Sequence, residues 1–201
     1  MSLGTHDITP PLVRNSISTK VGDSGETSLL YGGRVSKSNR RVEANGIGDE
    51  AVSLLGLARA HCDSGFLHDE LLEIQRLMFI ANAELTTEIS QLDSLRRHFL
   101  TIGDEQIDQL DGLLKKLEEE IELPPSFIIP GASVASATLD VARCKVRELE
   151  RAAVTLYEDD MLENKSLLVW LNRLSDCLFM MARYADRELP PEMVTGTRRT
   201  S

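Results

Sequence analysis

Residues 134–157 read VASATLDVARCKVRELERAAVTLY and carry the longest helical pattern in the chain. Small or apolar side chains recur there at steps of three and four residues: Ala135, Leu139, Ala142, Val146, Leu149, Ala153 and Leu156. That spacing places all seven on one stripe of an α-helix. Ser133 stands just before the pattern, where an N-cap residue belongs. The stretch predicts a long helix that buries a narrow face against other helices.

Four further segments show the same periodicity, at about residues 43–62, 67–85, 104–121 and 165–187. Asp104 is expected to cap the third of the five helices, and Pro124, Pro125 and Pro130 break the chain after it. The polar stretch 88–103 is expected to be a surface loop, and no alternating segment is long enough to seed a sheet. The fold class predicted is all-α, a ferritin-like, five-helix up-and-down bundle.

Composition excludes several classes of function. The chain has 201 residues, with 32 Asp and Glu against 22 Lys and Arg, so its formal net charge is −10. An acidic chain is poorly suited to nucleic acid, because that binding is driven by counterions released around Lys and Arg. Only nine residues are aromatic (one Trp, three Tyr and five Phe), too few for base-stacking platforms. No run of 18 apolar residues occurs, so no membrane span is expected.

Cysteine usage and the chain ends indicate a compartment. Cys62, Cys144 and Cys177 are few and widely spaced, as expected of free thiols under reducing conditions. Residues 1–15 lack the apolar core of a secretory signal. These features predict a cytoplasmic protein. Its expected organisation is a flexible N-terminus over 1–16, one helical domain over 17–188 and a flexible tail over 189–201.

Three short motifs match known functional patterns, but the surrounding sequence does not support those functions. The GDSG of residues 22–25 lacks a triad scaffold, and the G-x-G-x-x-A of residues 46–51 lacks the preceding strand of a dinucleotide fold. His61, Cys62 and His68 lie close in sequence, but no second ligand pair completes a metal spacing. No metal site made of protein side chains is therefore assigned.

Three polar clusters remain. The first covers residues 19–29 and 34–37, where small residues, hydroxyls, Lys20 and Lys37 supply the groups of a polyphosphate cradle or, alternatively, of an ordinary surface loop. The second is an arginine ridge at i, i+4 and i+8, formed by Arg143, Arg147 and Arg151. It is either an anion clamp or a solvated face paired with Glu148 and Glu150.

The third cluster is LNRLSD at residues 171–176, which sets Asn172 and Asp176 at i, i+4 and Arg173 and Asp176 at i, i+3. Polar pairing between helices is its alternative explanation.

Together these residues resemble a family. TKVGDSGETSL…GRVSK…RVEANGIGDE, FIIPGASVASATLDVARCKVRELER and LNRLSDCLFMMAR are similar, in that order, to the PduO-type ATP:cob(I)alamin adenosyltransferases over roughly residues 17–187. The resemblance implies a five-helix bundle that assembles as a homotrimer with its active sites between subunits. It implies transfer of the 5′-deoxyadenosyl group of ATP to the cobalt of cob(I)alamin, with release of triphosphate. Cobalamin as co-substrate, ATP and Mg²⁺ follow, as does a cobalamin reductase or reduced flavoprotein as partner.

The resemblance also implies roles for single residues. The ATP loop that cradles the triphosphate with Mg²⁺ matches Thr19, Gly22, Asp23, Gly25, Thr27 and Lys37, and Lys20 joins it by its charge. Arg147 matches an arginine on the phosphates and Asn172 an asparagine at the nucleotide, while Glu150 and Arg151 match further polar positions of the ATP site.

For the corrinoid, the matching positions are Phe127, Arg173 and Asp176. Phe127 corresponds to a ring that occupies the lower face of the corrin and displaces the axial base. Arg147, Asp176 and Phe127 are the expected catalytic residues. Asp49 and Arg143 match a salt bridge that joins two subunits.

Several positions depart from the family pattern: Val21, Asn45, Ala51, Val52, Ala132, Asp140 and Glu148. Glu148 replaces a second arginine, and its carboxylate is expected to pair with Arg147 or Arg151 and weaken phosphate binding. Two alternatives to the enzyme therefore stay open. One is a non-catalytic carrier or sensor of ATP or corrinoid, and the other is a structural bundle without ligands.

Overall fold

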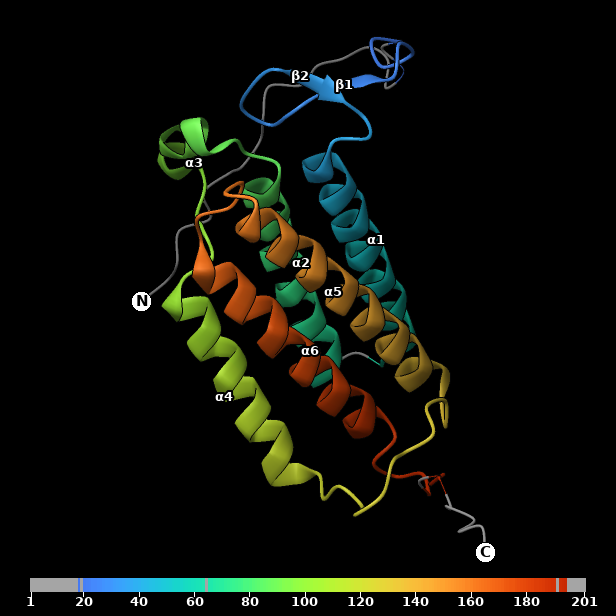
Figure 1. Cartoon of the computed structure of the whole chain (residues 1–201). Helices are drawn as coiled ribbons and strands as arrows, with labels where there is room; N and C mark the ends of the chain where they lie inside the picture. Colours follow the sequence, from blue (N-terminus) through green and yellow to red (C-terminus); the bar gives the residue numbers. More distant parts are fainter. Residues whose placement is uncertain (1–17, 19, 64, 191, 195–201) are drawn as a thin grey trace, which may run out of the picture.

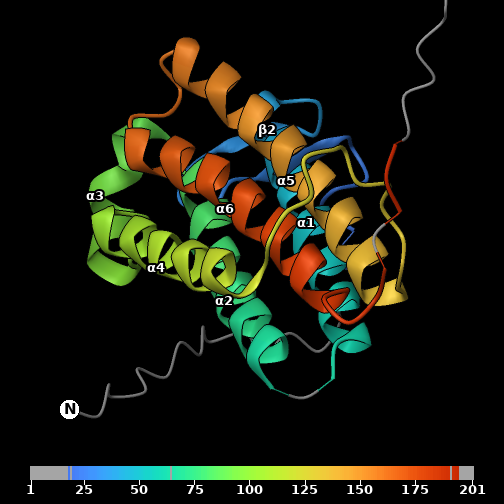
Figure 2. The same cartoon turned by 90° about the horizontal axis from the view of Figure 1, so that it is seen from below.

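The computed structural model describes residues 18, 20–63, 65–190 and 192–194, and this part of the chain is mostly helical, as the sequence predicts. Its long helices are α1 (Arg40–His61), α2 (Phe66–Leu85), α4 (Asp104–Glu120), α5 (Val134–Glu158) and α6 (Lys165–Ala185). Each corresponds to one predicted segment. Figure 1 shows them side by side in alternating directions, and Figure 2 shows the same bundle from its end.

The core forms where the predicted stripes meet. α5 packs against both α1 and α6, α2 packs on α1, and α4 packs on α6. The stripe of α5 is buried: Leu139, Ala142, Val146, Leu149 and Ala153 are fully inaccessible to solvent. Trp170 of α6 is the largest side chain among the fully buried residues. Cys177 also lies in this core, where burial raises the pKa of its thiol to about 12 and keeps it protonated.

One glycine of the rejected dinucleotide motif has a packing role. A Cβ at Gly48 would lie 2.0 Å from Asn82 Oδ1, so only glycine lets α1 approach α2 this closely. Gly46, two residues earlier on the same helix, has open space around it. Helix packing therefore explains Gly48 without a bound dinucleotide.

The predictions were wrong in two places. The expected surface loop 88–103 contains a 3₁₀ turn (η1, Ile89–Gln91) and a short helix (α3, Leu92–His98). Leu92, Leu95 and Ile102 are buried there, and this spacing is too short to give a periodic signal in the sequence. A two-stranded antiparallel hairpin of β1 (Glu26–Ser28) and β2 (Arg34–Ser36) also forms, although no strand was expected.

Helix ends follow the sequence in part. Ser133 caps α5 as predicted, since its side chain accepts a hydrogen bond from the N–H of Ser136. At α4 the cap is Gly103, and Asp104 is the first residue of the helix. The N–H of Gly103 donates to Gln106 Oε1 at 2.9 Å, so a side chain three residues into the helix satisfies the N–H of the cap residue.

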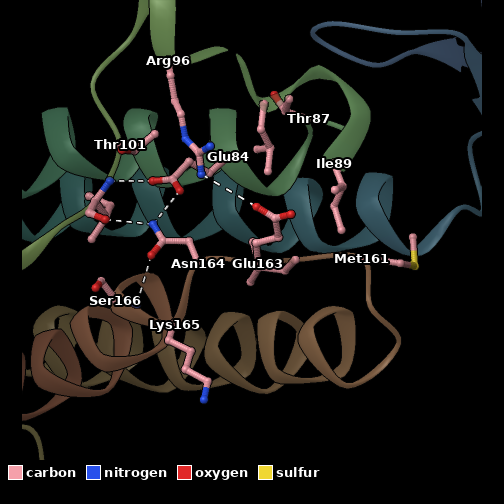
Figure 3. Close-up of a pocket in the computed structure, with 13 residues that line it drawn as sticks. Glu84, Thr87, Ile89, Arg96, Thr101, Met161, Glu163, Asn164, Lys165 and Ser166 are labelled. Carbon is pink, nitrogen blue, oxygen red and sulfur yellow. Dashed lines mark hydrogen bonds and ion pairs between the residues drawn. The ribbon is translucent and has the colours of Figure 1, made fainter. Parts of the chain in front are cut away.

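We call the end of the bundle that carries β1, β2 and the start of α1 the hairpin end (Figure 1). There Glu84 of α2 is 2% exposed and accepts hydrogen bonds from the N–H of Ile102 at 2.6 Å and from Asn164 Nδ2 at 2.7 Å. Asn164 Nδ2 also donates to the carbonyl of Ile102 at 2.8 Å. Figure 3 shows these contacts in a cavity of about 290 Å³, together with the Arg96–Glu163 ion pair. Side chains thus bind α2, α4 and α6 together at this end.

At the opposite end, which we call the Phe127 end, the loop 121–133 connects α4 to α5 and the segment after α6 runs beside it (Figures 1 and 2). None of the described helices is long and apolar enough to cross a membrane.

Candidate functional site

The N-terminal polar cluster is folded around the hairpin. Gly25 has a φ of +82°, a conformation that favours glycine, and its carbonyl accepts the N–H of Lys37 at 2.9 Å. The Lys37 ammonium lies 3.1 Å from the place of a Cβ on Gly22, so the lysine covers this glycine. Lys20, Asp23 and Lys37 are exposed, and Thr27 is half-buried in β1. Thr19 lies outside the described residues.

Arg34 holds the loop in this shape. Its Nε is 3.2 Å from Glu26 Oε2, and its NH2 group donates to the carbonyl of Val21 at 3.0 Å. The arginine thus ties both strands to the turn that precedes them. A tight glycine-containing loop with exposed lysines is suited to binding an anion.

A second polar surface spans α5 and α6. Asn172 Nδ2 donates to Glu150 Oε1 at 3.1 Å and brings the two helices' predicted residues together. On α5, Arg147 lies about one turn before Glu150 and Arg151 follows Glu150 directly, and both arginine side chains are exposed. Among the described residues neither arginine forms an ion pair, so both are free to bind an anion.

The expected pairing of Glu148 was wrong. Its carboxylate binds Lys145 Nζ at 2.7 Å, and Lys145 also binds Glu50 of α1 at 2.9 Å. These two hydrogen bonds raise the pKa of the Lys145 ammonium. Glu148 is three residues from both Lys145 and Arg151, so spacing allows either pairing, and the carboxylate takes the one with Lys145. The departure at Glu148 therefore leaves the arginines unneutralised.

Arg173 and Asp176 occupy a different side of α6. Arg173 forms an ion pair with Asp111 of α4 and lies 3.8 Å from Asp176. These residues face α4, whereas Asn172 faces α5. Asp111 was missed by the sequence reading, because it is one of many acidic residues on α4 and has no motif around it.

Arg143 and Asp49 do not meet within the chain. Arg143 Nε lies 3.2 Å from Asp140 Oδ1, its neighbour one turn earlier on α5. Asp49 accepts hydrogen bonds from Asn45 and Asn82, each at 3.3 Å.

Asp140, which departs from the family pattern, has a buried ion-pair partner. Asp140 and Arg183 are 5% and 6% exposed, and the two form an ion pair between α5 and α6. The Arg183 guanidinium also lies 5.1 Å from the ring centre of Phe179. Sequence reading missed Arg183, since the two residues are separated by 43 positions and only packing joins them.

Phe127 is 82% exposed at the Phe127 end. Its carbonyl accepts the N–H of Val194 at 2.9 Å, so its backbone is held while its ring faces solvent. An exposed aromatic ring on a held backbone is suited to contact with a flat ligand. The loop that carries Phe127 and the hairpin lie at opposite ends of α5 (Figure 1).

The described part of the chain offers no cluster of three or more His, Cys, Asp and Glu side chains that could hold a metal ion. The site that emerges has three parts. They are the hairpin loop, the α5–α6 surface with Arg147, Glu150, Arg151 and Asn172, and the exposed ring of Phe127.

Comparison with known proteins gives one consistent result. The chain matches the family model described as cobalamin adenosyltransferase over residues 17–185. It is 38% identical to a corrinoid adenosyltransferase of Citrobacter freundii over 167 residues, 83% of this chain and 93% of the relative. It is also 38% identical to the PduO corrinoid adenosyltransferase of Salmonella typhimurium, covering 86% of this chain but only 50% of that protein. The chain thus spans about half the length of that relative.

The solved structures agree. A variant PduO-type ATP:corrinoid adenosyltransferase from Lactobacillus reuteri, complexed with cobalamin and ATP, superposes with a TM-score of 0.81 at 29% identity. The match covers 90% of this chain and all of that one. The helical architecture, the order of the motifs and the length of the match point the same way, and the chain belongs to the cobalamin adenosyltransferase family.

Proposed function

We propose that this chain is an enzyme that transfers the 5′-deoxyadenosyl group of ATP to the cobalt of cob(I)alamin, forming adenosylcobalamin and triphosphate. The observation that carries the proposal is the α5–α6 surface of a family member, where Arg147, Glu150, Arg151 and Asn172 lie together and both arginines are unpaired. Unpaired guanidinium groups bind phosphate oxygens with charge-assisted hydrogen bonds.

The reaction requires mainly that the protein position the two substrates and neutralise the charge of the leaving triphosphate. The cobalt lone pair of cob(I)alamin attacks C5′ of ATP, the Co–C bond forms, and the C5′–O bond breaks with its electrons going to triphosphate. No proton transfer is needed. Arg147 and Arg151, with Lys20 and Lys37 of the hairpin loop, neutralise the leaving group. Asn172 orients the nucleotide, and Phe127 presents an apolar face to the corrin. Arg173 and Asp176 contact the corrinoid from the α4 side.

We propose that the active enzyme is a homotrimer of these helix bundles with sites between subunits. The hairpin and Phe127 lie at opposite ends of α5, whose 25 residues span roughly 37 Å. One chain cannot bring both to the same cobalt and C5′. A neighbouring subunit that supplies the hairpin resolves this, with Asp49 and Arg143 meeting across the interface.

Mg²⁺ is proposed to bind together with the nucleotide rather than at a site made of protein side chains alone. Magnesium keeps several waters and binds substrate phosphates with one or two carboxylates. Glu150, beside the two free arginines, is the carboxylate placed to approach it. We further propose a cytoplasmic enzyme whose cobalt is reduced by a separate reductase or reduced flavoprotein.

The test is an anaerobic assay with cob(I)alamin, ATP and Mg²⁺, following adenosylcobalamin by absorbance and triphosphate by chromatography. Turnover is expected in the unaltered chain, and Arg147→Ala is expected to lose about 100-fold in kcat/KM, or ~2.7 kcal/mol. Arg97→Ala, an exposed arginine on α3, is the matched control and should retain full activity. A folded chain that binds ATP or corrinoid without turnover would instead support the carrier function.

A further inference from the structure

The loop that carries Phe127 has an unusual support. Ile129 N–H donates to the carbonyl of Glu192 at 2.8 Å, and Val194 N–H donates to the carbonyl of Phe127 at 2.9 Å. These two bonds frame an antiparallel bridge between Ile128 and Met193. Ser126 Oγ adds a bond to the carbonyl of Val194 at 3.3 Å. The ordered contacts of the chain thus extend beyond residue 188.

The segment Glu192–Val194 is the backbone partner of the loop among the described residues. Between residues 122 and 132 of the described chain, the segment Glu192–Val194 supplies the only backbone hydrogen bonds that the loop makes. Three prolines in the loop, Pro124, Pro125 and Pro130, have no N–H to donate. Gly131, at a φ of +113°, turns the chain before α5 in a conformation that favours glycine. The loop would therefore lose its fixed shape without this segment.

The bridge determines which way the side chains of Phe127 and Ile128 face. Ile128 is half-buried and lines a cavity of about 180 Å³ with Leu189 and Pro190, whereas Phe127 next to it points outward. Neighbouring residues of an extended chain face opposite sides, so fixing Ile128 inward also fixes Phe127 outward.

We propose that the segment Glu192–Val194 is a positioning element for corrinoid binding: by pairing with residues 126–129 it holds the Phe127 ring where the corrin docks. This rests on the proposed adenosyltransferase function. A ring held in advance binds at a lower entropic cost than one that must be ordered on binding. Among the described residues, the hydrogen bonds of this segment go to residues 126–129 and none goes to a proposed ATP residue, so its effect is expected on the corrinoid.

Two shortened chains test this. One ends at Leu189 and lacks the segment, and the other ends at Val194 and keeps it. The chain ending at Leu189 should show a corrinoid KM raised about 10-fold, as expected from losing two or three hydrogen bonds, with the KM for ATP and the melting temperature unchanged. The chain ending at Val194 should match the full chain.

A point variant separates the hydrogen bond from the chain length. Val194→Pro removes the N–H that binds Phe127, and Val194→Ala keeps it. Only the proline variant should raise the corrinoid KM. Equal corrinoid KM values in all four variants and the full chain would overturn the inference while leaving the adenosyltransferase function intact.

Amide exchange gives a readout that needs no turnover. The N–H of Ile129 should exchange faster in the chain ending at Leu189 than in the one ending at Val194. Unchanged exchange would also overturn the inference. A full chain without adenosyltransferase activity would refute the proposed function instead, and the exchange experiment keeps the two failures apart.

Discussion

The helices at the hairpin end and the loop that carries Phe127 are held by different means. At the hairpin end, buried side chains tie the helices: Arg41 is 4% exposed and donates to the carbonyls of Leu85 and Met161, and Glu84 binds Ile102 and Asn164. At the Phe127 end, backbone bonds from one short segment hold a proline-rich loop, and an aromatic ring stays in solvent.

The difference separates stability from ligand contact. Buried hydrogen bonds cost much to break, because each orphaned polar group loses its partner without regaining water. An exposed ring on a loop costs little to remove, and such loops are where binding residues gather. Changes to the buried polar side chains of the hairpin end should therefore affect unfolding, and changes to the exposed ring of Phe127 should affect turnover.

The largest effect is expected at Arg41. Arg41→Met leaves two buried carbonyls without a donor and should lower the free energy of unfolding by about 4 kcal/mol. Arg40→Met is the control, because Arg40 is exposed and loses only a surface pair with Asp159, worth about 1 kcal/mol or less. Urea denaturation measures both. A similar loss in the two variants would contradict the structural role of Arg41.

Phe127→Ala should have the next largest effect, on activity alone. The ring is exposed, so the melting temperature should not change, but kcat/KM should fall about 100-fold, or ~2.7 kcal/mol. Phe79→Ala removes another exposed ring, 64% accessible on α2, and should leave turnover unchanged. If both variants stay fully active, Phe127 is not part of the site.

Glu84→Gln tests the buried hydrogen bonds of Glu84 to Ile102 and Asn164, which we call the Glu84 lock, by replacing one carboxylate oxygen with an amide nitrogen. Both Glu84 oxygens accept hydrogen bonds, so the amide NH₂ of glutamine would face a donor and cost roughly 2 kcal/mol of stability. Glu163→Gln, at the rim of the same cavity, should cost less than about 0.5 kcal/mol. Thermal unfolding of the two variants measures both losses, and equal losses would contradict a special role of the Glu84 lock.

The smallest effect is expected in the pH dependence of the stability that the Glu84 lock contributes. Burial raises the pKa of Glu84 above its ordinary value, and this outweighs its hydrogen bonds. The folded state therefore holds a proton more tightly than the unfolded state. Its contribution is full below the unfolded pKa of 4.5 and is lost as the pH rises through the folded pKa. The stability advantage of the unaltered chain over Glu84→Gln should shrink across that window, and a constant difference would contradict it.

Local pattern was enough for the helices, whereas the candidate residues follow from the resemblance of three short motifs to a family and stay predictions. A period of 3.6 residues depends only on the sequence within one segment, so all of the long helices could be predicted from it. The motifs around Asn172, Arg147 and the hairpin loop were likewise readable, because each is a short contiguous run.

Only the tertiary structure decided how these residues are paired. Glu148 turned to Lys145 and left Arg147 free, and Asp140 found Arg183 across 43 positions. The short helix α3 and the strands β1 and β2 escaped prediction, since three to seven residues are too few for a period to show. The bridge of Val194 to Phe127 joins residues 67 apart. Backbone pairing of that kind leaves no mark on side-chain composition, and so the sequence alone determined which groups are present but not which groups meet.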